Sequence, residues 1–183
     1  MYAKEINGQV ETARSLKTLY PNTSFPKDVQ EHDGWKRVVD NGAGDFQVKD
    51  VVVFIDGVPT QTYTDSVALK EAHLANYRDK KASTYTYRAV PMQLGVGARH
   101  DLSTLYLTAL ADSSILDSTV MAVWQEDGYS DLNITAKNLR DDGATIMGHY
   151  QKCWAVHSIV KARLSDYNTP AEIEGAFDAA YAA

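Results

Sequence analysis

The strongest constraint on the fold is a row of residues in the last third of the chain that recur at alternating spacings of four and three. This spacing places the row on one side of an α-helix, so we expect a helix from 136 to 164 that packs through that side. Met147 and Trp154 widen it. The row consists of Leu139, Gly143, Ile146, Tyr150, Cys153, His157, Val160 and Leu164.

Three further helices are expected. The last begins at Thr169-Pro170-Ala171-Glu172, where threonine caps the helix, proline takes the first turn and glutamate completes a capping box, and its apolar side holds Ile173, Ala176, Phe177 and Tyr181. Asp101 is placed to cap a helix over Leu102–Ala111. Asp65 or Ser66 is placed to cap a helix over Val67–Thr84, with Leu69, Leu74 and Tyr77 facing inward and Arg78, Lys80 and Lys81 outward.

The first third predicts strands. Asn7-Gly8 suits a tight turn between Ala3–Ile6 and Gln9–Ala13, and Asp56-Gly57 joins Phe46–Ile55 to Val58–Thr64. Val51–Ile55 is apolar on both faces, which predicts a central or doubly covered strand. Further strands are expected at Trp35–Asp40, Tyr85–Val96, Thr119–Gln125 and Tyr129–Ile134, and one helical turn at 15–20.

These elements predict an α+β protein with two parts. Residues 1–65 form an N-terminal antiparallel β module suited to docking, and residues 66–183 form a helical C-terminal domain with a small sheet. The change from strand to helical periodicity near Asp65 sets the boundary.

Composition narrows the function classes. The net charge of −6 does not suit binding to a phosphate backbone, so we expect no nucleic-acid partner. The single cysteine, Cys153, fits synthesis in a reducing cytoplasm. The first five residues resemble no secretory signal, and no apolar run approaches the roughly 20 residues needed to cross a bilayer, so we expect no membrane partner.

No group of residues predicts catalysis, a cofactor or a metal. His149 and His157 lie eight positions apart without a further ligand, and Cys153 lies on the apolar side of its helix, as a packing residue would. Asp141-Asp142 is expected to be a solvated pair in a first helical turn, and Glu126-Asp127-Gly128 a turn. Gly95-Val96-Gly97-Ala98-Arg99 lacks the lysine of a phosphate loop and is interpreted as a bend before Asp101.

Aromatic residues offer the only candidate interface. The chain holds 11 tyrosines and 3 tryptophans, residue types that are enriched where proteins meet. Tyr85 and Tyr87 alternate on an extended segment and so face one side, and Trp35 and Tyr63 belong to the N-terminal module. Ordinary core packing is the alternative for each of the four.

Two parts of the chain resemble phage proteins. The opening Met1-Tyr2-Ala3, Asn7-Gly8-Gln9-Val10 and the loop 21–26 ending in Ser24-Phe25-Pro26 are similar to the start of tail-fibre accessory proteins. The second half resembles an uncharacterised domain of tail-fibre and tail-fibre-assembly proteins. The residues that carry this second resemblance are Arg78, Asp101, Trp124, His149 and Thr169-Pro170-Ala171-Glu172-Ile173.

The resemblance implies a bacteriophage structural protein located in the virion tail, in a hetero-complex with tail-fibre or baseplate proteins, in one or more copies. We expect an adaptor that works by protein–protein contact in the host-attachment apparatus. A tail-fibre assembly chaperone is the alternative, and a cell-envelope hydrolase a remote one, because no acid and base pair is apparent.

Overall fold

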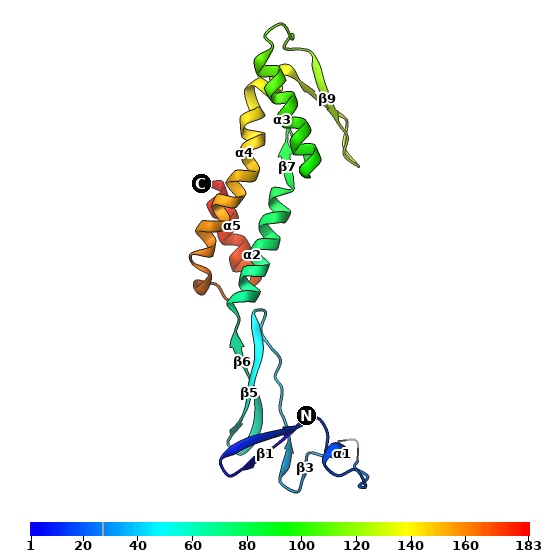
Figure 1. Cartoon of the computed structure of the whole chain (residues 1–183), viewed down its shortest axis with the longest axis vertical. Coiled ribbons are helices and arrows are strands. Elements are labelled where there is room, and N and C mark those ends of the chain that lie inside the picture. The colour runs from blue at the N-terminus through cyan, green and yellow to red at the C-terminus, as the bar shows by residue number, and fades with distance from the viewer. Residues whose placement is uncertain (27) are drawn as a thin grey trace. The chain divides into compact units, whose positions relative to one another are not determined.

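The computed structural model describes residues 1–26 and 28–183, which form two compact units, Met1–Leu69 and Lys70–Ala183 (Figure 1). The first unit is built from antiparallel strands, and the second from helices with two small sheets. The predicted α+β class, with an antiparallel β region followed by helices and small sheets, is confirmed.

The first unit begins with the expected hairpin. Strands β1 (Tyr2–Ile6) and β2 (Gln9–Ala13) are joined by Asn7 and Gly8, whose φ angles of 54° and 77° are those of a tight hairpin turn. The short helix α1 (Leu16–Leu19) follows, capped by the side chain of Ser15. Strands β3 (Glu31–His32) and β4 (Trp35–Arg37) complete a sheet of order β2-β1-β4-β3.

A second hairpin in this unit pairs β5 (Gln47–Ile55) with β6 (Val58–Asp65). The prediction that Val51–Ile55 is a central or doubly covered strand is wrong, because β5 belongs to a two-stranded sheet. One face of the hairpin is buried and carries Val52, Pro59 and Gln61. Val51 and Ile55 are exposed, so the apolar run does not report burial on both faces.

The second unit alternates helices with hairpins. Its elements are α2 (Val67–Ala82), β7 (Thr84–Tyr87), β8 (Val90–Gln93), α3 (Val96–Ala111), β9 (Val120–Trp124), β10 (Leu132–Thr135), α4 (Ala136–Lys161), the 3-10 turn η1 (Leu164–Asp166) and α5 (Pro170–Ala182). α2 begins in the last residues of the first unit, and Ser66 Oγ accepts a hydrogen bond from the Leu69 amide. The predicted capping box of Thr169 and Glu172 at the start of α5 is confirmed.

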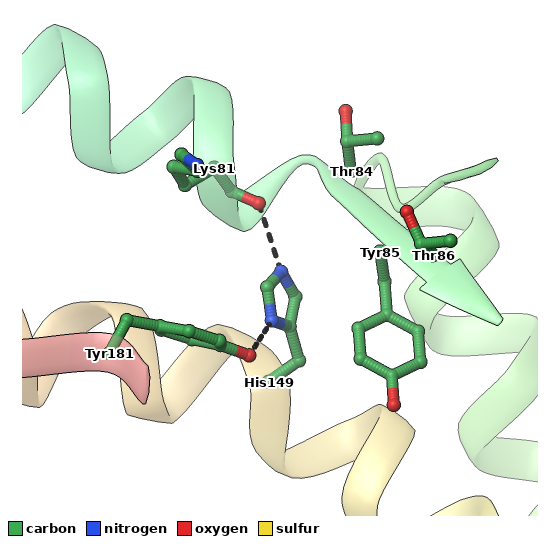
Figure 2. A pocket seen from close by; sticks show the side chains of 6 residues that line it. All are labelled: Lys81, Thr84, Tyr85, Thr86, His149 and Tyr181. Atoms are coloured by element: carbon green, nitrogen blue, oxygen red, sulfur yellow. Dashed lines mark hydrogen bonds between the residues drawn. The ribbon is translucent and has the colours of Figure 1, made fainter. Parts of the chain in front are cut away.

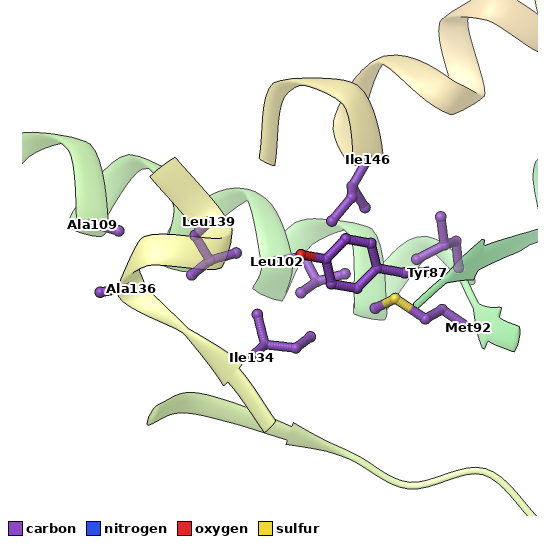
Figure 3. Packing of buried hydrophobic residues seen from close by; sticks show 9 residues of the cluster. Tyr87, Met92, Leu102, Ala109, Ile134, Ala136, Leu139 and Ile146 are labelled. Carbon is purple, nitrogen blue, oxygen red and sulfur yellow. The ribbon is translucent and has the colours of Figure 1, made fainter. Parts of the chain in front are cut away.

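The core of the second unit lies between the β7–β8 hairpin, α3, β10 and α4 (Figure 3). The predicted apolar side of α4 supplies much of it, since Leu139, Gly143 and Ile146 are buried there and Cys153 and Val160 are buried further along. α5 adds its own buried residues, Ile173 and Phe177.

Five local predictions in and around α2, α3 and α4 are wrong. Asp101 caps nothing, because α3 already begins at Val96 with Gly95 as its cap, and the glycine-containing segment is helix rather than a bend. Arg78 does not face outward: it is 9% exposed and its guanidinium lies 3.7 Å from the ring centre of Trp154. Leu69, expected to face inward, is exposed. Asp141 and Asp142 lie beyond the first turn of α4, since that helix begins at Ala136.

The segment expected to be extended from Tyr85 to Val96 is a hairpin. Its chain reverses at Arg88 and Ala89, whose φ angles are 51° and 64°. Neither residue is a glycine or an asparagine, the residue types that signal such a turn in a sequence. The sequence therefore contains no recognisable signal for this turn.

Candidate functional site

The second unit contains a cavity of about 290 Å³ where the last turns of α2 and α5 and the middle of α4 meet one strand (Figure 2). Lys81 comes from the last turn of α2, His149 from the middle of α4 and Tyr181 from the last turn of α5. The strand β7 supplies the rest of the lining, Thr84, Tyr85 and Thr86.

Contacts between α2 and α5 hold Tyr181 in this position. His73 Nε2 lies 3.1 Å from Glu174 Oε1, and Lys81 Nζ lies 2.9 Å from Asp178 Oδ1. The Tyr77 hydroxyl donates to Asp178 Oδ2 at 2.9 Å. Positions one helical turn apart on each helix thus face one another, so α5 is fixed along α2.

His149 ties the three helices together. Its Nε2 lies 2.9 Å from the backbone oxygen of Lys81, and its Nδ1 lies 2.5 Å from the Tyr181 hydroxyl. A carbonyl oxygen only accepts hydrogen bonds, so Nε2 carries a proton, and in the neutral ring Nδ1 accepts the Tyr181 proton. The imidazole therefore satisfies a carbonyl that has no partner within the end of its own helix.

Aromatic rings enclose this imidazole. The ring centres of Tyr85 and Tyr181 lie 5.0 Å and 5.5 Å from that of His149. Lys152, on the same helix as His149, places its Nζ 4.8 Å from the ring centre of Tyr181. Burial raises the pKa of the Tyr181 hydroxyl above its ordinary value, so this hydroxyl keeps its proton at neutral pH.

Behind the cavity lining, one buried residue and His149 resemble a nucleophile beside a base. Cys153 Sγ lies 3.9 Å from His149 Nε2, but that nitrogen already donates to the Lys81 oxygen. Burial raises the pKa of the Cys153 thiol, and its side chain is fully buried. A reactive thiolate needs the opposite setting, with a lowered pKa and an accessible sulfur, so this cysteine packs the core.

Within residues 1–26 and 28–183, no three histidine, cysteine, aspartate or glutamate side chains lie close enough to hold a metal ion. None of the helices in the described part of the chain is both long enough and apolar enough to cross a membrane.

The four aromatic residues predicted as an interface fall into two pairs. Trp35 in β4 is buried, and Tyr63 in β6 is half-buried with its hydroxyl bonded to Asp40. Tyr85 lines the cavity, whereas Tyr87 is buried in the core and its hydroxyl lies 2.5 Å from Asp142 Oδ2. Tyr63 and Tyr85 keep accessible surface; an interface through these four residues stays a prediction.

The residues that carry the family resemblance do not gather at one site. His149 lines the cavity, while Arg78 stacks on Trp154. Trp124 packs against the core from the end of β9, and Asp101 is exposed on α3. No local sequence pattern indicates that His149 shares a cavity with Lys81, Thr84, Thr86 and Tyr181, because His149 meets Lys81 across 68 positions and Tyr181 across 32.

Comparison with protein-family models found no match to this chain, and neither the curated proteins nor the solved structures searched contain one.

Proposed function

We propose that this protein is a structural adaptor of a bacteriophage tail, in a fibre, spike or baseplate appendage, and that it acts by protein–protein contact. The observation that carries the proposal is an apolar surface on the first unit. At the end of the β5–β6 hairpin, Val53, Ile55 and Val58 lie on the face opposite the buried one. We call these three residues the hairpin patch.

The hairpin patch has the properties of a contact surface. Ile55 and Val58 are direct cross-strand partners and remain 52% and 45% exposed. Exposed apolar groups that lie together gain free energy when a partner removes them from water, at roughly 25 cal/mol per Å². A docking role for the N-terminal module is also what the resemblance to tail-fibre accessory proteins implies.

The proposal is tested in the phage that encodes this chain. Mass spectrometry of purified virions is expected to find the protein in the tail, and an Ile55→Lys/Val58→Lys variant is expected to be lost from it. A matched control, Glu11→Lys/Thr12→Lys, places two lysines on exposed polar positions of the β1–β2 hairpin and is expected to be retained. Wild-type virions without the protein would overturn the proposal.

A co-expression experiment distinguishes an adaptor from an assembly chaperone. A chaperone is required for soluble, trimeric fibre, whereas a docked component is dispensable for fibre folding. Co-expression of the fibre with and without this chain is expected to yield equal amounts of soluble trimer. Dependence of the trimer on the chain, together with its absence from virions, would assign the chaperone role instead.

A further inference from the structure

The strand β7 has one unpaired edge. β7 and β8 form a two-stranded sheet, and no other strand of the described residues joins β7 on its second side. An edge strand presents backbone N–H and C=O groups that can pair with another extended chain. What the edge of β7 can bind depends on which of its backbone groups point outward and on the residues beside them.

The register of the hairpin shows which backbone groups of β7 point away from β8. Arg88 and Ala89 form a two-residue turn, so the flanking pair Tyr87 and Val90 exchange hydrogen bonds across the hairpin. Hydrogen-bonded and non-hydrogen-bonded pairs then alternate along the ladder. Thr86 opposite Pro91, and Thr84 opposite Gln93, are consequently non-hydrogen-bonded pairs.

Two further observations support this assignment of hydrogen-bonded and non-hydrogen-bonded pairs. The Leu94 amide donates to the Ser83 oxygen at 2.6 Å, which makes that pair hydrogen-bonded, as the alternation requires. Pro91, which has no N–H, occupies a position that faces away from β7, where no ladder bond is lost. The backbone N–H and C=O groups of Thr84 and Thr86 therefore point to the outer edge of β7.

The cavity lies along the same strand. Thr84, Tyr85 and Thr86 line it, with His149 and Tyr181 on the other elements (Figure 2). The Tyr85 and Thr86 hydroxyls have no hydrogen-bond partner among the described residues. A chain paired with the outer edge would have hydrogen-bonding side chains beside it, and alternate side chains of an added strand enter such pockets.

The charges beside the cavity favour one kind of side chain. Lys152 approaches the Tyr181 ring and has no carboxylate partner in the described part of the chain. Arg88 lies at the adjacent turn, with its guanidinium 5.2 Å from the ring centre of Tyr87. Lys81 is already paired with Asp178. The cations without a carboxylate partner favour an acidic group on the ligand.

We propose that the outer edge of β7 binds an extended peptide segment of another protein as a third strand, with an acidic side chain of that segment in the cavity. Thr84 and Thr86 each offer one donor and one acceptor, and their two-residue spacing matches the repeat of a paired strand. This goes beyond the proposed function, because the edge would take such a segment in any assembly.

The test uses capped hexapeptides that alternate valine with threonine and carry glutamate, glutamine or lysine at the third position. Titration into the ¹⁵N-labelled full chain is expected to shift the amide signals of Thr84 and Thr86. The glutamate peptide is expected to bind most tightly and the lysine peptide most weakly.

Protein variants separate the edge from its surroundings. Thr86→Pro removes an outward N–H without removing a ladder bond, and is expected to weaken binding by about tenfold. The control Gln93→Pro places the same residue on the outer edge of β8 and is expected to bind within about twofold of the wild type.

Two outcomes would overturn the proposal: no shift with any of the three peptides, or equal losses of affinity from Thr86→Pro and Gln93→Pro. Pairing of two copies through β7, seen by sedimentation and abolished by Thr86→Pro, would replace the peptide with a second chain. If Thr86→Pro fails to fold, peptides N-methylated at two successive residues test the same hydrogen bonds. The virion experiment tests the proposed tail role independently of peptide binding.

Discussion

The Nδ1 atom of His149 and the hydroxyl oxygen of Tyr181 lie 2.5 Å apart, and this contact joins the middle of α4 to the last turn of α5. Because Nε2 of the same ring is bonded to Lys81, one imidazole connects all three helices. We therefore expect the attachment of α5 to depend on this pair.

Tyr181→Phe keeps the ring and removes the hydroxyl. His149 then loses the donor to Nδ1 in a buried setting, so the free energy of unfolding is expected to fall by about 1–2 kcal/mol in urea denaturation. Tyr150→Phe is the matched control on α4, because the Tyr150 hydroxyl has no hydrogen-bond partner among the described residues. Equal effects of the two variants would contradict a structural role for the His149–Tyr181 bond.

Substituting alanine for Gly143 or for Gly148, both on α4, is expected to change the free energy of unfolding in opposite directions. A Cβ atom at Gly143 would lie 2.4 Å from Tyr106 Cδ2, where α3 crosses α4. Gly143→Ala is therefore expected to lower the free energy of unfolding by roughly 1–3 kcal/mol. At Gly148 nothing lies within 4 Å, so Gly148→Ala is expected to raise it by about 0.5–1 kcal/mol. Thermal unfolding of both variants checks the signs, and a destabilising Gly148→Ala would refute the argument.

Ala89→Gly is expected to stabilise the β7–β8 hairpin. Ala89 holds a φ of 64°, a left-handed conformation that costs an alanine about 1–2 kcal/mol relative to right-handed backbone. Glycine avoids most of that cost, so the free energy of unfolding should rise by about 1 kcal/mol. Ala144→Gly makes the same change at an exposed helical position of α4 and should lower it by a similar amount. Chemical denaturation measures both; a loss of stability in Ala89→Gly would be inconsistent with strain in the turn.

We expect the first unit to lose stability in acid because of Asp40. Hydrogen bonds from Lys49 and from the Tyr63 hydroxyl hold the pKa of the Asp40 carboxyl well below its ordinary value. A folded pKa below the unfolded one contributes stability above about pH 4, and this contribution is lost as pH falls toward the folded pKa.

Carbon-detected NMR of the carboxyl groups measures the pKa of Asp40. Lys49→Gln and Tyr63→Phe are each expected to move the pKa of Asp40 upward, Lys49→Gln by more, since the Lys49 bond is the larger cause. Asp40→Asn is expected to remove this part of the acid dependence. An Asp40 titration that neither variant shifts would show that these contacts do not form in solution.

The fold class and most elements followed from local patterns. Asn7-Gly8 and Asp56-Gly57 specify tight turns because their backbones tolerate positive φ, and the Thr169-Pro170-Ala171-Glu172 start satisfies its own helix end. The spacing of Leu139, Gly143 and Ile146 places the three residues on one side of α4 wherever the helix packs. These features depend only on neighbours within a turn or two, so the sequence by itself determined them.

Burial and the cavity depended on tertiary structure. Arg78 lies inward because Trp154, from another helix, offers a ring for its guanidinium, whereas Ile55 is exposed because no other element of the described residues covers its face. His149 meets Lys81 and Tyr181 only after three helices pack. Such contacts join residues distant in sequence, and a local pattern carries no information about which distant group will become its neighbour.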